Sequence, residues 1–393
     1  MSESLATAVA AETTNDPSAR IRRFLDTHRP PTPCLVLDLD VVEHNYRKLR
    51  AALPDARIFY AVKANPHPEV VRLLVELGAC FDVASTGEID LCLAQGAAPE
   101  TISYGNTIKK AADIAYAFAR GVRLFVLDSA QDVRHLAEHA PGASVFCRVL
   151  VEADGARTPF GKKFGCAPEM AVDLLREAGE LGLTVYGVSF HVGSQHVDPA
   201  AWELGITRAA QIAAAGVPVG LVNLGGGFPS VYTEAVPALT EYAAVIERAL
   251  DRHFPGARPD LIIEPGRALV GDAGMIRSEV VLVSKKSAED THRWVYLDVG
   301  RYNGMAECEG EAIAYELRTE HDGGADGPVV IAGPTCDGDD VLYQRTAYRL
   351  PLALAAGDHV DIPCTGAYTA SYSSVSFNGF PSLTTHVIGA KQS

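Results

Sequence analysis

Short apolar runs alternate with amphipathic stretches from residue 58 to residue 264 of the chain. The apolar runs are rich in β-branched residues and bounded by Gly, Pro or Asp, as buried strands are. Between most of them, apolar residues recur at spacings of three and four, as in PEVVRLLVELG and PEMAVDLLREAGELG, and this spacing predicts helices. The eight predicted strands span residues 58–64, 80–84, 102–104, 124–128, 145–151, 185–192, 221–224 and 261–264.

Eight strands, each followed by a helix, are the signature of a parallel (β/α)8 barrel, so we expect a TIM-like barrel. A doubly wound open sheet remains the alternative, because counting strands does not show that the sheet closes. After about residue 275 the pattern changes to strands with few long helices, as in MIRSEVVLVSKKS and HRWVYLDVG. This change predicts a second, all-β domain of the sandwich or Greek-key type.

The same patterns suggest how the chain is divided. We expect a flexible tail over residues 1–19 and a segment over 20–37 that joins the β domain. The barrel is expected over 38–275 and the β domain over 276–393.

Composition and charge narrow the class of protein. The 393 residues are 48% hydrophobic and 21% charged, which is typical of a globular protein with one or two domains. The net charge of −15, with no block of Lys and Arg, argues against nucleic acid as a partner. We see no apolar run of about 18 residues and no leader with a basic start, so we expect neither a membrane span nor a signal peptide. The eight cysteines occur singly, without a C-x-x-C pair, and we expect a cytoplasmic protein with reduced thiols.

Polar residues gather where the predicted strands end. In a parallel barrel the carboxyl ends of the strands meet at one mouth, and catalytic groups lie there. We therefore expect these residues to converge, although they come from distant parts of the sequence. They are Lys63, Asp82, Arg148, His191, Ser194, Gly226, Gly227, Glu264 and Arg267.

Each of these features taken alone has an ordinary structural explanation. Lys63 reads as a surface lysine at a strand end, and three glycines after a strand read as a turn. A single histidine is usually a core residue, and Glu264 can simply pair with Arg267. His135 and His139 are four residues apart on a predicted helix, but they have charged neighbours and no third ligand, so we expect no metal site.

Together the features match one cofactor. Pyridoxal phosphate (PLP) needs a lysine amine, a phosphate site, a flat ring to stack on and an anion beside its ring nitrogen. Bare backbone amides of a glycine turn can bind phosphate, and an arginine adds charge-assisted bonds. The combination moves Lys63 from a surface residue to a candidate cofactor anchor.

Several motifs then follow in a fixed order along the chain. They are AVKAN (61–65), FDVASTGEID (81–90), RVLVEADGA…KKFGC (148–166), FHVGSQ (190–195), LGGGFP (224–229), EPGR (264–267), GPTCDGDDVLY (333–343) and GAYTASYSSVSFNGF (366–380). With these motifs the chain resembles the fold type III pyridoxal-phosphate decarboxylases, in particular their bacterial ornithine/lysine decarboxylase branch. The likeness runs from about residue 33 to the C-terminus.

The resemblance implies a role for each site residue. Lys63 would hold PLP covalently, His191 would stack on its ring, and Glu264 would pair with its ring nitrogen. Asp82, Glu88 and Arg148 would surround the lysine and the ring. The phosphate would be bound by the residues Ser194, Gly226, Gly227, Arg267 and Tyr368.

It further implies the decarboxylation of a basic L-amino acid, L-ornithine and/or L-lysine, to putrescine or cadaverine and CO2. The enzyme would be a homodimer with shared active sites, to which the partner contributes Cys336 and Asp337. Cys336 would protonate the product carbon and Asp337 would bind the distal ammonium group. Tyr302 and Glu311 are further substrate-binding candidates.

Two stretches depart from the family pattern. The loop reads CDGDD where this branch more often has a serine and a small residue after Cys-Asp, so Asp339 and Asp340 are also candidates for the substrate ammonium. Residues 303–311, NGMAECEGE, occupy the stretch that shapes the substrate pocket, with Glu307 and Glu311 as possible ligands. Both departures concern the substrate and not the chemistry.

Other readings stay open at this point. One is a decarboxylase of diaminopimelate or another diamino acid; a second carboxylate on the substrate calls for an arginine and not for Asp337. An amino-acid racemase of the same barrel type would lack the Cys-Asp loop. An inactive regulatory homologue would have no need to retain Lys63, Glu264 and Cys336 together.

Overall fold

The computed structural model describes residues 17–152, 155–159 and 161–389, which form two compact units. One unit runs from Glu43 to Val270, and the other combines the residues up to Val42 with those from Gly271 onward. The sequence suggested boundaries at residues 38 and 275. Most of the predicted tail lies outside the described residues, and a helix begins at Pro17, inside its last three residues.

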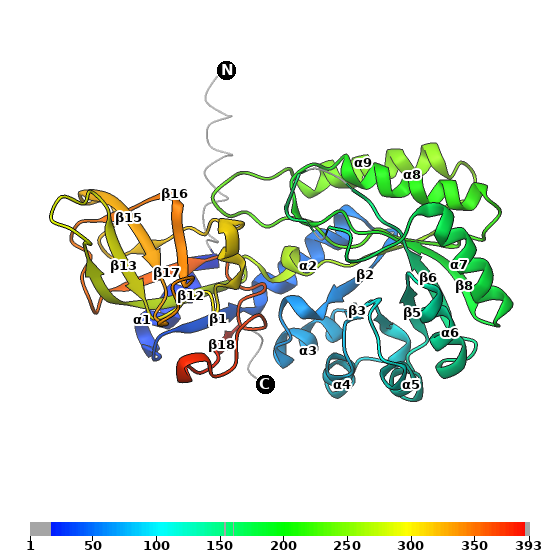
Figure 1. Ribbon diagram of the computed structural model, residues 1–393, viewed down its shortest axis with the longest axis horizontal. Coiled ribbons are helices and arrows are strands. Elements are labelled where there is room, and N and C mark those ends of the chain that lie inside the picture. The colour runs from blue at the N-terminus through cyan, green and yellow to red at the C-terminus, as the bar shows by residue number, and fades with distance from the viewer. Residues whose placement is uncertain (1–16, 153–154, 160, 390–393) are drawn as a thin grey trace, which may run out of the picture. The chain divides into compact units, whose positions relative to one another are not determined.

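The first unit is a closed barrel of eight parallel strands (Figure 1). They are β2 (Ala56–Ala61), β3 (Cys80–Val83), β4 (Ile102–Tyr104), β5 (Leu124–Leu127), β6 (Ser144–Arg148), β8 (Thr184–Ser189), β10 (Leu221–Asn223) and β11 (Asp260–Ile263). Because β11 pairs with β2, the sheet closes, which confirms the barrel and excludes the open sheet.

Helices connect the strands around the outside of the barrel (Figure 1). They are α2 (Leu39–Ala52), α3 (Pro68–Glu76), α4 (Thr86–Ala94), α5 (Ala111–Ala119), α6 (Ala130–His139), α7 (Pro168–Glu180), α8 (Ala201–Ala214), α9 (Leu239–His253) and the short α10 (Arg267–Val270). Several begin at capping residues: the side chains of Ser85 and Ser129 accept hydrogen bonds from the first turns of α4 and α6. These caps fix where each helix leaves the barrel mouth.

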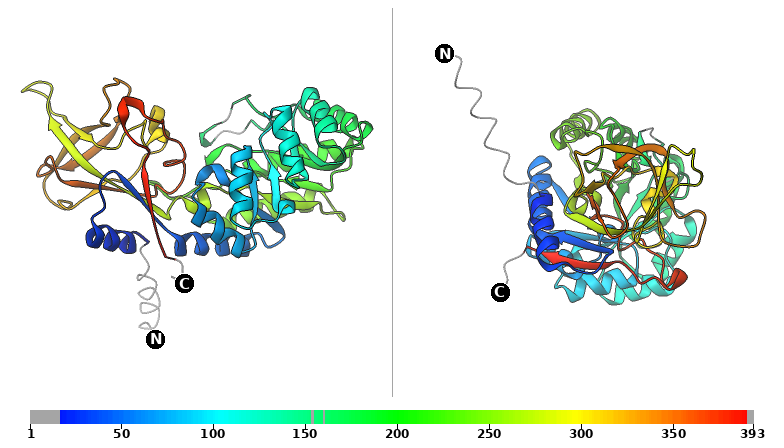
Figure 2. Two further views of the ribbon diagram at one scale, coloured as in Figure 1. Left: turned by 90° about the horizontal axis from the view of Figure 1, so that it is seen from below. Right: turned by 90° about the vertical axis from the view of Figure 1, so that its left-hand side faces the viewer.

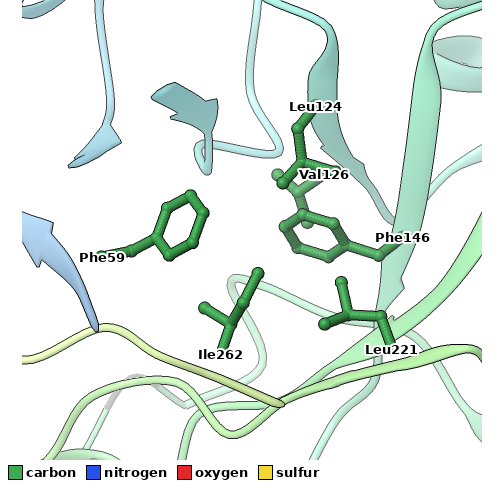
Figure 3. Packing of buried hydrophobic residues seen from close by; sticks show 6 residues of the cluster. All are labelled: Phe59, Leu124, Val126, Phe146, Leu221 and Ile262. Atoms are coloured by element: carbon green, nitrogen blue, oxygen red, sulfur yellow. The ribbon is translucent and has the colours of Figure 1, made fainter. Parts of the chain in front are cut away.

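The barrel interior is filled by six apolar side chains from five strands (Figure 3). Phe59 and Phe146 are the largest members of the cluster, and each is 1% exposed. Burying a side chain of this size stabilises the folded chain by about 1.5–3 kcal/mol. These side chains form a packed layer inside the barrel. Its members are Phe59, Leu124, Val126, Phe146, Leu221 and Ile262.

Three strands end three residues earlier than the sequence predicted. β2 ends at Ala61 and is followed by a 3-10 turn, η1 (Val62–Ala64), so that Lys63 lies on a turn and not in a strand. β6 ends at Arg148 and β8 at Ser189. The apolar pattern misled here because turn residues such as Val62 are themselves buried.

The second unit is an eight-stranded, mainly antiparallel sheet structure (Figure 2). Its strands are β1 (Cys34–Asp38), β12 (Gly274–Ser284), β13 (Arg293–Leu297), β14 (Arg318–Thr319), β15 (Asp326–Ala332), β16 (Val341–Pro351), β17 (His359–Pro363) and β18 (Thr384–Ile388). β1 pairs with β12 and β18, and α1 (Pro17–His28) packs its Ile21 and Leu25 against β1. The N-terminal segment of the described chain is therefore part of this unit.

Within the described residues, no helix is long and apolar enough to cross a membrane.

Candidate active site

Lys63 lies beside a buried carboxylate at the carboxyl end of the barrel. Its Nζ is 3.1 Å from Oδ2 of Asp82 on β3, whose register places Asp82 next to Ala61. The Asp82 side chain is 5% exposed, whereas the Lys63 side chain is 46% exposed. The amine is thus held by a fixed anion and still faces solvent, as an amine that reacts with a ligand must.

Glu264 follows β11 and is enclosed by protein on most sides. Burial raises its pKa to about 7 from the usual 4.5, and the negative charge of Asp82 adds to this rise. The Asn223 amide donates a hydrogen bond to Oε1 of Glu264 at 2.5 Å. This bond and the positive charges of Lys63 and Arg148 oppose the rise in the pKa of Glu264. A buried carboxylate of raised pKa is well suited to a cationic group, whose charge would favour its ionised form.

His191, two residues after β8, is held as a neutral ring. Its Nδ1 accepts a hydrogen bond from the backbone N–H of Gly193 at 2.9 Å, so the ring proton is on Nε2. Burial, with Arg148 and Lys63 nearby, holds the pKa of His191 well below its usual range. A neutral, fixed imidazole of this kind offers a flat face for stacking.

A glycine loop follows β10 and packs closely against its neighbours. A Cβ on Gly226 would lie 2.5 Å from the carbonyl oxygen of Glu264 and 3.2 Å from Nε2 of His191. A Cβ on Gly227, where φ is +100°, would lie 2.5 Å from the carbonyl oxygen of Gly193. The loop therefore has room for bare backbone only, as a phosphate cradle requires.

Arg267 lies at the start of α10 and is 3% exposed. Its Nη2 donates to Oγ of Ser194 at 3.2 Å and its Nη1 donates to the hydroxyl of Tyr232 at 2.5 Å. The guanidinium and the Ser194 hydroxyl form a second group of anion-binding donors in the same unit.

Arg148 and Glu88 complete the set predicted around the lysine. Burial lowers the pKa of Arg148, while Glu264 and Asp82 oppose that change, so these charges act on one another. Glu88 accepts a hydrogen bond from the Ala84 N–H at 2.6 Å, and burial raises its pKa. Arg148 and His191 both line a cavity of about 350 Å³.

The remaining predicted site residues belong to the second unit. Cys336 and Asp337 are exposed, and the Cys336 N–H donates to Oδ1 of Asn378 at 3.1 Å. The ring centroid of Tyr302 is 4.8 Å from that of Phe377. Three stretches far apart in sequence therefore meet around the Cys-Asp loop.

Tyr368, in the loop after β17, has a left-handed backbone with φ of 56°, which is uncommon for a non-glycine residue.

Two acidic candidates have local structural partners. The carboxylate of Glu311 accepts hydrogen bonds from the N–H groups of Arg345 and Thr346 and from the Thr346 hydroxyl, and its pKa falls to about 2. Buried Asp340 accepts from the N–H groups of Arg301 and Thr335. These bonds favour a structural role for both residues over contact with a substrate.

Sequence reasoning missed Asn223 and Tyr232. Asn223 links Glu264 to the glycine loop, because its Oδ1 also accepts from the Gly225 N–H at 3.0 Å. Asn223 is the last residue of β10, so the search for polar residues at strand ends could have found it. Tyr232 lies in an irregular loop, where no such rule applies.

The residues fit PLP by their chemistry. An accessible amine, a neutral imidazole and a carboxylate of raised pKa lie at one barrel end, with a side-chain-free glycine loop beside a buried arginine. A (β/α)8 barrel with this set defines the class of PLP-dependent barrel enzymes.

Comparison with known proteins agrees with this class. Residues 39–271 match the family described as pyridoxal-dependent decarboxylase, pyridoxal binding domain. The lysine/ornithine decarboxylase of Selenomonas ruminantium is 36% identical over 359 residues, which cover 90% of this chain and 88% of that protein. The chain therefore belongs to the pyridoxal-dependent decarboxylase family.

Solved structures resemble most of the chain. SrLDC in complex with PLP and cadaverine has a TM-score of 0.83 and 34% identity, covering 94% of this chain and 93% of that one. The lysine/ornithine decarboxylase of Vibrio vulnificus complexed with cadaverine has a TM-score of 0.84 and 32% identity, covering 95% and 98%.

Proposed function

We propose that this chain is a PLP-dependent decarboxylase that converts L-ornithine and/or L-lysine to putrescine or cadaverine and CO2. The observation that carries the proposal is the Lys63–Asp82 pair at the barrel mouth, with the coupled charges of Arg148 and Glu264 around it. Relatives named as lysine/ornithine decarboxylases, one of them in complex with PLP and cadaverine, support the substrate class.

Within this function, each barrel residue has one task. Lys63 binds the cofactor covalently, and Asp82 holds its amine in place. PLP, once bound, supplies an electron sink that accepts the electron pair released when the α-carboxylate leaves. His191 supports the ring from one face, and Glu264 faces the ring nitrogen, where a positive charge offsets the cost of its burial.

The phosphate is bound by Ser194, Gly226, Gly227 and Arg267, and the resemblance to the decarboxylase family adds Tyr368. Backbone N–H groups and a guanidinium are the donors that dianionic phosphate prefers. The close packing of the glycine loop and the left-handed backbone of Tyr368 support these assignments.

Cys336 delivers the proton that the product carbon needs, and Asp337 binds the distal ammonium group of the substrate. Of the eight cysteines, all of them free and within the described residues, Cys336 is the exposed one. Tyr302 lies against the same loop through Phe377 and lines the substrate side. We further propose that the working unit is a cytoplasmic homodimer whose partner supplies this loop; the free thiols suit that compartment.

The proposal is tested by a substrate panel. Purified protein loaded with PLP should release CO2 from L-ornithine or L-lysine and form the matching diamine. A preference for meso-diaminopimelate would contradict the proposed substrate, and a protein that binds PLP without releasing CO2 from any amino acid would contradict the activity.

A further inference from the structure

Tyr232 contacts Arg267, one of the proposed phosphate-binding residues, and the proposed function gives Tyr232 no role. Its hydroxyl accepts the hydrogen bond from Nη1 of Arg267 at 2.5 Å, while Nη2 of the same guanidinium donates to Ser194. Two hydroxyls thus flank one buried arginine.

The loop that carries Tyr232 is fixed at its base. Ser230 and Gln195 exchange two hydrogen bonds, of 2.7 and 3.0 Å, and Oγ of Ser230 donates to the carbonyl oxygen of Arg267 at 3.0 Å. Ser230 is 7% exposed and Gln195 is 5% exposed. These bonds join the Tyr232 loop to β9 (Ser194–His196) and to α10, so the position of Tyr232 is set by the same elements that set Ser194 and Arg267.

The direction of the bond decides what the hydroxyl can do. An arginine only donates, so the Tyr232 oxygen accepts and its own hydrogen points elsewhere. The Ser194 hydroxyl is in the same situation. A dianion bound to the guanidinium between them would receive an O–H bond from each side, and bonds of this charge-assisted kind are the stronger ones.

We propose that Tyr232 is a further phosphate-binding residue, which donates its hydroxyl hydrogen to the cofactor phosphate and orients the Arg267 guanidinium toward it. The inference rests on PLP being the cofactor of the proposed function. It adds a ligand from the loop after the glycine cradle to those that the resemblance implies.

The Tyr232→Phe variant isolates the hydroxyl. The guanidinium carbon of Arg267 lies 5.8 Å from the Tyr232 ring centroid, and phenylalanine keeps that ring. Tyr186→Phe is a matched control, because the Tyr186 hydroxyl also makes a hydrogen bond, to Oδ2 of Asp260 at 2.6 Å. Asp260 is the first residue of β11, at the end of the strand away from Glu264.

The experiment measures the Kd of the cofactor-stripped full-length chain for PLP and for pyridoxal, which lacks the phosphate. Tyr232→Phe should weaken PLP binding about tenfold, as expected for one charge-assisted bond, and leave the Kd for pyridoxal within about twofold. Inorganic phosphate should raise the Tm of the wild type and of Tyr186→Phe, and raise that of Tyr232→Phe less. Equal PLP affinity in Tyr232→Phe and wild type, or equal weakening of PLP and pyridoxal, would overturn the inference and leave the proposed function intact.

Two further results close the test. Tyr232→Leu removes the ring as well and should weaken PLP at least as much as Tyr232→Phe, with pyridoxal affinity again retained; PLP binding as tight as wild type in this variant would also refute the role. A wild-type chain that binds neither PLP nor pyridoxal would count against the proposed function itself.

Discussion

At the scale of single residues, Glu264 has the most informative environment. Its pKa of about 7 lies above the usual 4.5 because burial and Asp82 disfavour its charged form. A folded-state pKa above the unfolded value means that the folded chain binds the proton more tightly. The contribution of Glu264 to stability is therefore fully present below about pH 4.5 and is lost as the pH rises through about 7.

The Glu264→Gln variant tests this environment in the cofactor-free protein. Glutamine stays neutral, so the free energy of unfolding of the variant relative to wild type should rise between pH 5 and pH 8, by at most roughly 3 kcal/mol. Urea unfolding at the two pH values measures it. A difference that does not change with pH would show that Glu264 is ionised throughout this range.

The residues that sequence reasoning identified share a simple signal. Lys63, Asp82 and Glu264 are charged side chains at the ends of apolar strands, where charge is unexpected. Asn223 also ends a strand but is uncharged, and Tyr232 lies in a loop, so neither residue stands out in the sequence. Their importance comes from contacts to Glu264 and Arg267, 41 and 35 residues away in sequence, which only the folded chain brings together.

At the scale of elements, all eight barrel strands were predictable because each is a short buried run between turn residues. The positions at which these strands end were not predictable, because buried turn residues such as Val62 and Ala64 continue the apolar pattern beyond the strand. The short strands β7 (Ala156–Thr158) and β9 were also missed, because their sequences, ART and SQH, are not apolar runs.

The glycine loop after β10 offers a prediction at this scale. Gly226→Ala places a Cβ 2.5 Å from a carbonyl oxygen and 3.2 Å from the His191 ring, so the loop must move where the cofactor binds. We expect PLP affinity to fall at least about tenfold and Tm to fall as well, because backbone atoms must give way, with the far-UV circular dichroism of the wild type retained. Gly220→Ala serves as control for a loop glycine substitution, since its backbone is not left-handed and the nearest neighbour of a Cβ there is the Tyr186 carbonyl oxygen, at 3.4 Å. Wild-type PLP affinity in Gly226→Ala would contradict the assignment of the cradle.

The Cys-Asp loop is the element expected to read the substrate. Asp337→Asn removes the anion proposed to bind the distal ammonium group, and kcat/KM for ornithine and lysine should fall about tenfold or more. PLP absorbance should not change, because the phosphate and ring contacts lie elsewhere. Asp339→Asn tests a neighbouring exposed aspartate, and we expect a smaller effect. If Asp337→Asn keeps wild-type kcat/KM for both substrates, the ammonium group binds another carboxylate.

At the scale of the whole molecule, the proposed active site draws on two subunits. Mixing inactive Lys63→Ala chains with inactive Cys336→Ala chains should then restore activity, because a heterodimer holds one site with both residues intact. The restored activity should reach about a quarter of wild type with free exchange, since half the dimers are mixed and each has one of two sites. Activity that stays at the parental background, with exchange confirmed by native mass spectrometry, would place Cys336 in the same chain as its Lys63.

The central claim is that Lys63 anchors the cofactor, and borohydride reduction followed by peptide mass spectrometry tests it most directly. In PLP-loaded wild type, the mass of reduced cofactor should appear on the peptide that contains Lys63. The Lys63→Ala variant should fold normally and carry no such adduct, since the Lys63 side chain is 46% exposed at the barrel mouth. An adduct on a different lysine, or an unmodified Lys63 peptide in PLP-loaded wild type, would contradict the account.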